Sequence, residues 1–232
     1  MRLKKLEFYF LELIFLMSSI HFSFGIEEKN DTTKEIVHFM KAAEEFEIDK
    51  DQIKYELCKS YIKEYYNSEA YGNEVAVLCK EAEHYFSQLN VTEKSLIFFD
   101  VDDTAVRSSC WEVEFLGINI PPIKSILPVL DLYKLLIAKG FNVIFITGRR
   151  DQRYEETKQE LEESGYHGFV DLICMPHELW INHVRESVGL WKCSVRKELA
   201  QHYDIVGSIG DRDLDFVGGY SGKIIKLPNY LY

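Results

Sequence analysis

Residues 95–104, Ser-Leu-Ile-Phe-Phe-Asp-Val-Asp-Asp-Thr, constrain the fold of this chain more than any other stretch. Their first part is an unbroken apolar run, which is typical of a strand buried on both faces of a parallel sheet. The run ends in Asp100, Asp102 and Asp103. Because ligands of open α/β sheets bind beyond the carboxyl ends of the strands, the stretch predicts a site that holds two or three carboxylates.

Carboxylates this close in the sequence also indicate what accompanies them. Like charges repel, so the cluster needs a cation or a shared proton. Mg²⁺ is a suitable cation, because it prefers hard oxygen ligands such as carboxylates and the oxygens of a phosphate group. The chain leaves the strand at Asp100, so a turn can aim Asp100 and Asp102 in different directions. The alternative is an acidic turn that only closes the strand, and the remaining chain decides between the two.

The second half of the chain alternates between predicted strands and helices. Apolar runs at residues 141–146, 169–175, 204–209 and 223–226 predict strands, and patterns at about 128–139, 152–164 and 192–203 predict helices. Residues 176–189 are ambiguous and could form a short helix. This alternation favours βαβ units, and hence an α/β fold with a Rossmann-like parallel sheet and flanking helices.

Residues 26–94 are expected to form an N-terminal helical layer on a catalytic domain at 95–232. Apolar spacing predicts helices near 32–43, 51–67 and 73–89. In the third helix the predicted packing stripe consists of Val77, Ala82, Tyr85 and Phe86. Tyrosines along these helices are interpreted as packing residues rather than ligand contacts.

The first 25 residues have the pattern of a secretory signal peptide. Arg2, Lys4 and Lys5 precede a mostly apolar run that is interrupted by Glu12. We therefore expect a secreted or periplasmic protein. An N-terminal membrane anchor is the less favoured alternative, because the run is short for a spanning helix. No later stretch of the sequence is apolar enough to span a bilayer, so no stable span is expected after signal removal.

The net charge and the cysteines of the chain limit the kinds of partner, metal site and disulfide that it can have. The 232 residues carry a formal net charge of -11, which argues against a nucleic acid polymer as partner. The five cysteines fit no zinc pattern; they are Cys58, Cys79, Cys110, Cys174 and Cys193. Cys58 and Cys79 are candidates for a disulfide, and buried thiols are the equal alternative. Asn30 and Asn90 lie in glycosylation sequons. The oligomeric state is not determined by these features.

Polar residues recur at the predicted strand ends and helix starts, in one order along the chain. These residues are Asp100 and Asp102, then Thr147, then Lys192, then Asp211 with Asp213 and Asp215. Phosphoryl transfer needs such groups for positioning and charge stabilisation. A carboxylate can attack phosphorus, a second can move a proton, and a hydroxyl and a lysine can hold the phosphoryl oxygens. A further carboxylate can complete a Mg²⁺ site.

Some of these residues have competing interpretations. Lys192 is preferred over Lys197 as the cationic residue because it stands at the start of the predicted helix rather than within it. Thr147 could by itself be no more than part of a helix cap and turn. Asp213 is expected to face solvent rather than bind a metal.

The residues Asp100-Val-Asp102-Asp-Thr104 after an apolar strand resemble the first motif of the haloacid dehalogenase (HAD) superfamily of phosphatases, Asp-x-Asp-x-Thr. The resemblance covers about residues 40–232. Further similar stretches are 145–149, 191–196 and 207–211. They resemble those of the secreted acid phosphatases in that superfamily, a group that includes bacterial class C enzymes and plant acid phosphatases or vegetative storage proteins.

The resemblance implies a role for each matched position. It makes Asp100 the nucleophile, Asp102 the acid/base and Lys192 the third-motif lysine. The implied metal ligands are Asp100, Asp211 and the backbone carbonyl of Asp102, with Asp215 in support. Thr147 would be the hydroxyl of the second motif. Residues expected to contact substrate are Thr104, Gly148 and Trp111. Departures from the family pattern at Asp103, Ser108 and Trp111 leave the substrate preference open.

The function expected from this resemblance is that of a secreted, Mg²⁺-dependent phosphomonoesterase that works through an aspartyl-phosphate. Its partner would be a small phosphomonoester. One alternative is a storage or interaction protein of low activity on the same fold. Another is a nucleotide phosphatase of narrow specificity.

Overall fold

The computed structural model describes residues 60–62, 64–66, 68–107, 125–181 and 185–230. The chain divides into two compact units, Met1–Tyr71 and Gly72–Tyr232. The predicted signal peptide, the predicted helix near 32–43 and most of the one near 51–67 lie outside the described residues. Within the described part of the chain, none of the helices combines the length and the apolar character needed to cross a bilayer.

The second unit is built on a five-stranded, wholly parallel sheet with the order β3-β2-β1-β4-β5. Its strands are β1 Ser95–Phe99, β2 Asn142–Arg150, β3 Asp171–Met175, β4 Asp204–Gly210 and β5 Lys223–Lys226. The central strand β1 is buried at every residue, as its apolar run predicts. The α/β fold class is thus confirmed.

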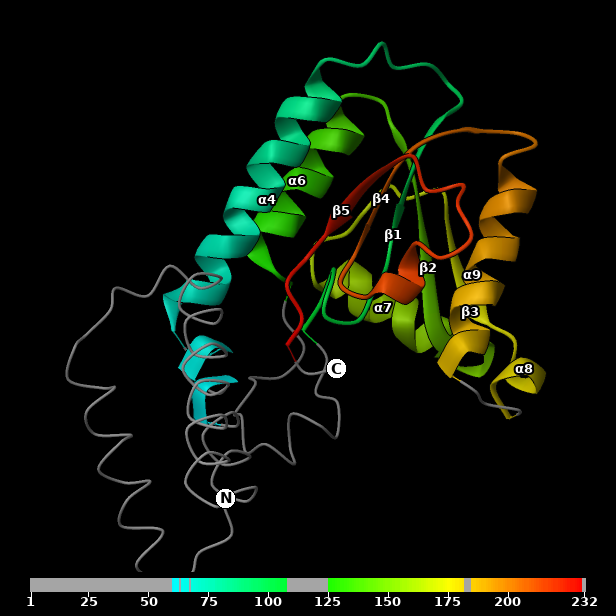
Figure 1. The fold of residues 1–232 in the computed structure, drawn as a ribbon. Coiled ribbons are helices and arrows are strands. Elements are labelled where there is room, and N and C mark those ends of the chain that lie inside the picture. Colours follow the sequence, from blue (N-terminus) through cyan, green and yellow to red (C-terminus); the bar gives the residue numbers. More distant parts are fainter. Residues whose placement is uncertain (1–59, 63, 67, 108–124, 182–184, 231–232) are drawn as a thin grey trace, which may run out of the picture. The chain divides into compact units, whose positions relative to one another are not determined.

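Helices cover both faces of this sheet (Figure 1). They are α4 Glu69–Ser87, α6 Leu127–Ala138, α7 Tyr154–Glu163, α8 His177–Ile181 and α9 Arg185–Leu199, with short 3-10 helices η1 Asp151–Arg153 and η2 Asp213–Asp215. On the face covered by α6, the ring of Tyr133 packs against Phe99, Phe145 and Tyr166. On the opposite face, Trp191 of α9 packs into a cluster with Phe98 and other apolar strand residues.

The packing stripe of α4 differs from the predicted one. The buried residues are Val75, Cys79, Ala82 and Phe86, whereas Val77 is 56% and Tyr85 37% exposed. The prediction was therefore right for Ala82 and Phe86 and wrong for Val77 and Tyr85. The ring of Phe86 lies against Gly207 of β4 and 5.9 Å from the ring of Phe141. These contacts tie α4 to the sheet. The expected division into a helical segment at 26–94 and a catalytic domain at 95–232 stays a prediction.

Helix α9 begins at Arg185, seven residues before the predicted start at Lys192. Lys192 therefore lies inside the helix, and the premise on which it was preferred is wrong. Gly189 lies inside α9, at the point where the helix packs against the segment around Leu214. A Cβ atom on Gly189 would be 3.2 Å from Leu214. Close packing thus offsets the low helix propensity of glycine at this position.

The described cysteines, Cys79, Cys174 and Cys193, are free thiols. Cys58 and Cys110 lie outside the described residues. Cys79 is buried, which agrees with its interpretation as a buried thiol.

Candidate active site

Three buried carboxylates meet at the carboxyl ends of β1 and β4. Asp100 directly follows β1, Asp211 directly follows β4, and Asp215 lies in η2. One oxygen of each lies within 4.8 Å of the others. Gly210 makes this possible, since a Cβ atom there would collide with the Asp215 carboxylate. The sequence predicted this edge of the sheet, although it assigned Asp215 only a supporting role.

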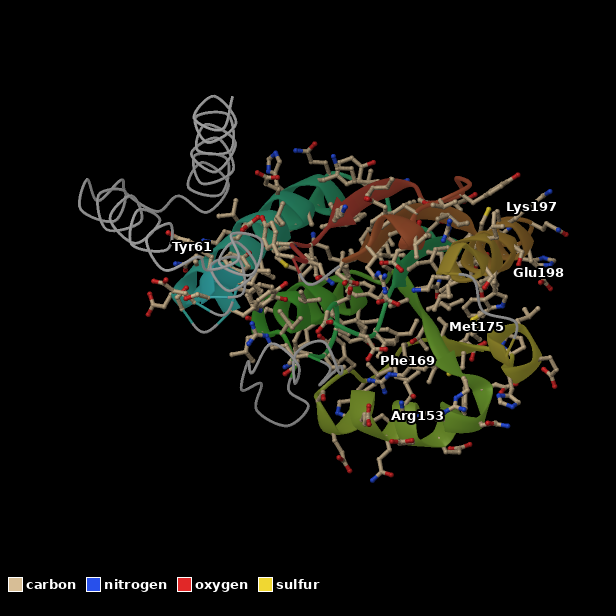
Figure 2. All side chains as sticks on the ribbon, turned by 60° about the horizontal axis from the view of Figure 1, so that its bottom comes forward. Tyr61, Arg153, Phe169, Met175, Lys197 and Glu198 are labelled. Carbon is tan, nitrogen blue, oxygen red and sulfur yellow. The ribbon has the colours of Figure 1, made fainter. Side chains whose placement is uncertain are left out.

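A single ammonium group bridges two of these carboxylates. Lys192 Nζ donates a hydrogen bond to Asp100 Oδ1 and another, of 2.6 Å, to Asp215 Oδ1. Its side chain is 5% exposed. Lys197, the competing candidate, is exposed at the outer side of α9 (Figure 2). Because a helix places residues five apart on different faces, only Lys192 points toward the sheet.

Burial governs the ionisation of the cluster. It raises the pKa of Asp100 well above the ordinary value, which Lys192 opposes and the neighbouring carboxylates Asp215 and Asp211 reinforce. Burial, reinforced by the charge of Asp215, raises the pKa of Asp211 to about 7. Burial also disfavours the charge on Lys192, yet Asp100 and Asp215 outweigh it and raise the pKa of that ammonium. With all three carboxylates ionised, the cluster would carry more negative charge than one lysine neutralises.

Asp211 is held at both oxygens. The hydroxyl of Thr104 donates to Oδ1 over 3.2 Å, and the amide of Asn229 donates to Oδ2. Thr104 is fully buried and gives its only hydroxyl proton to Asp211 in this structure. Its expected contact with substrate stays a prediction, whereas the structure shows its hydrogen bond to Asp211. Asn229 was not found from the sequence, because nothing near it in the chain marks it as a partner of Asp211.

The loop that carries Asp215 is fixed by a buried arginine. Arg196, which is 1% exposed, donates to the backbone carbonyls of Asp215, Val217 and Gly219. It lies four residues after Lys192 and therefore on the same helix face. This spacing was the available signal, but no local pattern indicated that Arg196 would bind a loop.

Asp102 is not part of the group of three carboxylates and has Arg149 as its side-chain partner. Asp103 adopts the left-handed backbone conformation, with φ of 53°, and thereby turns the chain after β1. Arg149 binds the Asp102 carboxylate through Nε, at 3.1 and 3.0 Å, and through Nη2, at 2.8 Å. The two aspartates have different side-chain partners, Lys192 for Asp100 and Arg149 for Asp102, which agrees with a turn that aims them differently. Arg149 ends the motif-like stretch 145–149, but nothing in the sequence predicted its pairing with Asp102.

The second motif lies within β2 rather than beyond its end. Strand β2 continues to Arg150, and Thr147 pairs with Cys174 of β3. Thr147 is fully buried, and its oxygen accepts the backbone N–H of Arg149 at 3.1 Å. Gly148 is partly exposed, and a Cβ atom there would be 3.4 Å from the Val188 side chain of α9. Trp111, the remaining residue expected to contact substrate, lies outside the described residues.

The acidic cluster has the chemistry of a divalent cation site. All three candidate ligands are carboxylates, which hard divalent cations prefer. Burial and the neighbouring carboxylates raise the pKa of Asp100 and of Asp211, so added positive charge would stabilise their ionised forms. A bound cation would supply it. Asp100, Asp211 and Asp215 therefore fit such an ion.

The raised pKa of Asp211 predicts how the stability of the metal-free protein depends on pH. The folded protein keeps this proton between about pH 4 and pH 7, whereas the unfolded chain loses it near the ordinary pKa of 3.8. The free energy of unfolding should therefore decrease as the pH rises through this window, at up to about 1.4 kcal/mol per pH unit. Chemical denaturation in chelator at several pH values measures this decrease.

The control for this experiment is a neighbouring surface aspartate. Asp211→Asn should reduce the slope between pH 4 and 7, because the amide does not titrate; the part that remains comes from Asp100, whose pKa is also raised. Asp213→Asn should retain the slope, since the Asp213 side chain is 82% exposed. An equal slope in Asp211→Asn and the unchanged protein would contradict the prediction.

The fold and the site together define a class of protein. A parallel sheet that presents buried carboxylates and a lysine at its carboxyl edge is the arrangement of an α/β enzyme of phosphoryl transfer. The chain belongs to the HAD superfamily, subfamily IIIB (acid phosphatase), whose family model matches residues 25–115 and 121–232. It is accordingly a phosphomonoesterase of the acid phosphatase type, and the family that its motifs resemble is confirmed.

Individual relatives agree with this family. The chain is 28% identical over 194 residues to the stem 28 kDa glycoprotein of Glycine max, covering 76% of this chain and 75% of the relative. It is 29% identical over 196 residues to vegetative storage protein 2 of Arabidopsis thaliana, covering 75% and 71%. The tungstate-bound class C acid phosphatase from Bacillus anthracis has a similar fold. Its TM-score is 0.57 at 17% identity, over 76% of this chain and 86% of that one.

Proposed function

We propose that this protein is an exported, Mg²⁺-dependent phosphomonoesterase that forms an aspartyl-phosphate on Asp100. The observation that carries the proposal is the buried cluster of Asp100, Asp211 and Asp215 around Lys192. It combines a candidate nucleophile, a fixed cation and oxygen ligands for a metal at one point.

In the first step Asp100 attacks phosphorus. Among the described residues, only its Oδ1 accepts a side-chain hydrogen bond, from Lys192, which leaves Oδ2 as the attacking atom. The bond from phosphorus to the leaving oxygen breaks as the Asp100–phosphorus bond forms. Protonated Asp102 gives its proton to that leaving oxygen, so an alcohol departs.

In the second step water attacks the phosphorus of the aspartyl-phosphate. The Asp102 carboxylate accepts a proton from this water, which restores its protonated form, and inorganic phosphate leaves Asp100. The ammonium of Lys192 stabilises negative charge in both steps, because it is already fixed beside Asp100. Thr147 and Gly148 are proposed to hold the phosphoryl oxygens.

The metal would be held by Asp100, Asp211 and the Asp102 backbone carbonyl, with Asp215 beside them. When bound, Mg²⁺ would neutralise charge on the phosphoryl group and orient it. Thr104 and Asn229 would keep the Asp211 carboxylate in place as a ligand. Asp215 is proposed to act in support, because its two oxygens already accept Lys192 and the backbone N–H of Arg212.

The proposal is tested by hydrolysis of p-nitrophenyl phosphate by the whole protein. Chelation should abolish turnover and Mg²⁺ should restore it, with Ca²⁺ and Zn²⁺ as comparison ions. Asp211→Asn should raise the Mg²⁺ concentration needed for half-maximal activity at least about tenfold, since hydrogen-bonded carboxylate ligands determine metal affinity. The matched variant Asp213→Asn should leave the titration unchanged. Full activity of the metal-stripped protein would refute the metal requirement.

The alternatives give other outcomes in the same experiment. A storage or interaction protein would turn over neither p-nitrophenyl phosphate nor any ester in a panel of nucleotides and sugar phosphates. A nucleotide phosphatase of narrow specificity would act on nucleotides alone. Asp100 favours the enzyme over the storage protein, because the nucleophile that turnover needs is present and paired with Lys192.

Export is proposed on the N-terminal pattern. Arg2, Lys4 and Lys5 before an apolar run are typical of a cleaved signal peptide. Asn90, which lies in a sequon, is exposed and accessible to glycosylation in a eukaryotic secretory pathway. Mass spectrometry of the mature protein should show a chain that starts near Ile26, and an intact Met1 in a membrane fraction would favour the anchor instead.

A further inference from the structure

Arg149, near the end of β2, is one of the most constrained polar side chains outside the acidic cluster in the described part of the chain. Its side chain is 7% exposed, and its three nitrogens all have partners. Nε and Nη2 contact both oxygens of Asp102, while Nη1 contacts Glu160 and, at 3.3 Å, the hydroxyl of Thr157. An arginine bound in this way cannot rotate without losing several charge-assisted hydrogen bonds.

Asp102, by contrast, has little else to fix its direction. It follows β1 on a turn, and its side chain is 36% exposed. Its carboxylate has two rotatable bonds, so its position beside a substrate would vary without a partner. The planar fork of Arg149 contacts both oxygens and therefore fixes the plane of the carboxylate as well as its direction.

The other end of Arg149 is anchored in α7. Thr157 is fully buried and the Glu160 side chain is 16% exposed, so neither is a mobile surface group. Through its contacts with Asp102, Glu160 and Thr157, Arg149 links β2 to α7 and to the turn after β1. A rigid helix thus determines where the Asp102 carboxylate lies.

We propose that Arg149 is the positioning residue for proton transfer by Asp102. The inference rests on the proposed function, in which Asp102 protonates the leaving oxygen. Loss of that proton leaves a carboxylate, and the guanidinium of Arg149 stabilises this charge as it forms. Arg149 therefore controls the turnover of esters whose leaving group needs a proton, and it matters less for esters whose leaving group departs as a stable anion.

The test compares kcat/KM on an alkyl phosphate, glycerol 2-phosphate, and on p-nitrophenyl phosphate. Arg149→Ala should lose about ten- to a hundredfold on the alkyl ester, in line with losing charge-assisted hydrogen bonds, and much less on the nitrophenyl ester. In a chain that already carries Asp102→Asn, the same change should cost less than about twofold, because the group that Arg149 positions can no longer move a proton.

The chain offers a matched control four residues away. Arg153 also holds a carboxylate with two nitrogens, Glu156 at 2.9 and 2.8 Å, but its side chain is 41% exposed (Figure 2). Arg153→Ala should cost less than about twofold in kcat/KM on either substrate, because Arg153 lies 4.0 Å from Glu160 but does not contact Asp102. Arg149→Lys keeps the positive charge but lacks the planar guanidinium, so it should not restore kcat/KM on the alkyl ester. If Arg149→Ala does not fold, Glu160→Gln keeps the guanidinium but weakens its anchor, and it should show a smaller loss with the same preference.

Each other outcome overturns a defined claim. Suppose that Asp102→Asn loses more kcat/KM on the alkyl ester than on the nitrophenyl ester. If Arg149→Ala then costs the same on both esters, or adds its full loss to that of Asp102→Asn, Arg149 does not act through Asp102. The proposed function stands in that case. If Asp102→Asn itself costs the same on both esters, Asp102 is not the proton donor, and both claims are withdrawn.

Discussion

Asp100→Asn is expected to end turnover of every phosphate ester, with a loss in kcat/KM on the order of 10⁴-fold or more. The amide cannot attack phosphorus, and no other described carboxylate lies on the same strand end with a lysine against it. Good leaving groups will not relieve the loss, because the missing group is the nucleophile rather than the acid. Hydrolysis of p-nitrophenyl phosphate, followed over hours, measures the residual rate.

A second measurement separates loss of chemistry from loss of structure. Burial disfavours the charge of Asp100, so the metal-free Asp100→Asn protein should melt no lower than the unchanged one. Acid-quenched enzyme should carry phosphate label in the unchanged protein and none in Asp100→Asn. Asp204→Asn, an exposed aspartate at the other end of β4, is the matched control. Measurable label or turnover in Asp100→Asn would show that another residue is the nucleophile.

Lys192→Ala is expected to lose at least about a hundredfold in kcat, as when one preorganised donor is removed from an active site. The loss should be similar on nitrophenyl and alkyl esters, because the ammonium stabilises charge and does not move the leaving-group proton. This equal loss distinguishes Lys192 from Asp102 and Arg149. Steady-state kinetics on the two esters checks the expectation.

Stability has to be measured beside activity for this residue. Removing Lys192 leaves Asp100 and Asp215 buried without their cation, a change that typically costs about 3–5 kcal/mol. Mg²⁺ should recover part of this loss, because it supplies positive charge at the same place. Lys197→Ala, on the exposed side of α9, should change neither kinetics nor melting temperature. If Lys197→Ala lost activity and Lys192→Ala did not, Lys197 would be the lysine that stabilises the phosphoryl charge.

The sequence by itself determined the sheet and the edge at which the site lies. Apolar runs and the carboxylates that follow them are local signals, since a strand buried on both faces needs apolar residues and a polar residue ends it. These signals correctly located β1, β4 and the positions of Asp100 and Asp211. The motif order also led to the family, because a motif consists of neighbouring residues that can be compared directly.

Only the tertiary structure decided which side chains support these residues. Thr104 reaches Asp211 across 107 positions and Arg149 reaches Asp102 across 47, so no local pattern links them. Helix faces were decided in the same way. Val75 rather than Val77 faces the core, and Lys192 reaches the site from within α9. Periodicity shows that a helix has an apolar side, but the start and rotation of each helix depend on the surface against which it packs.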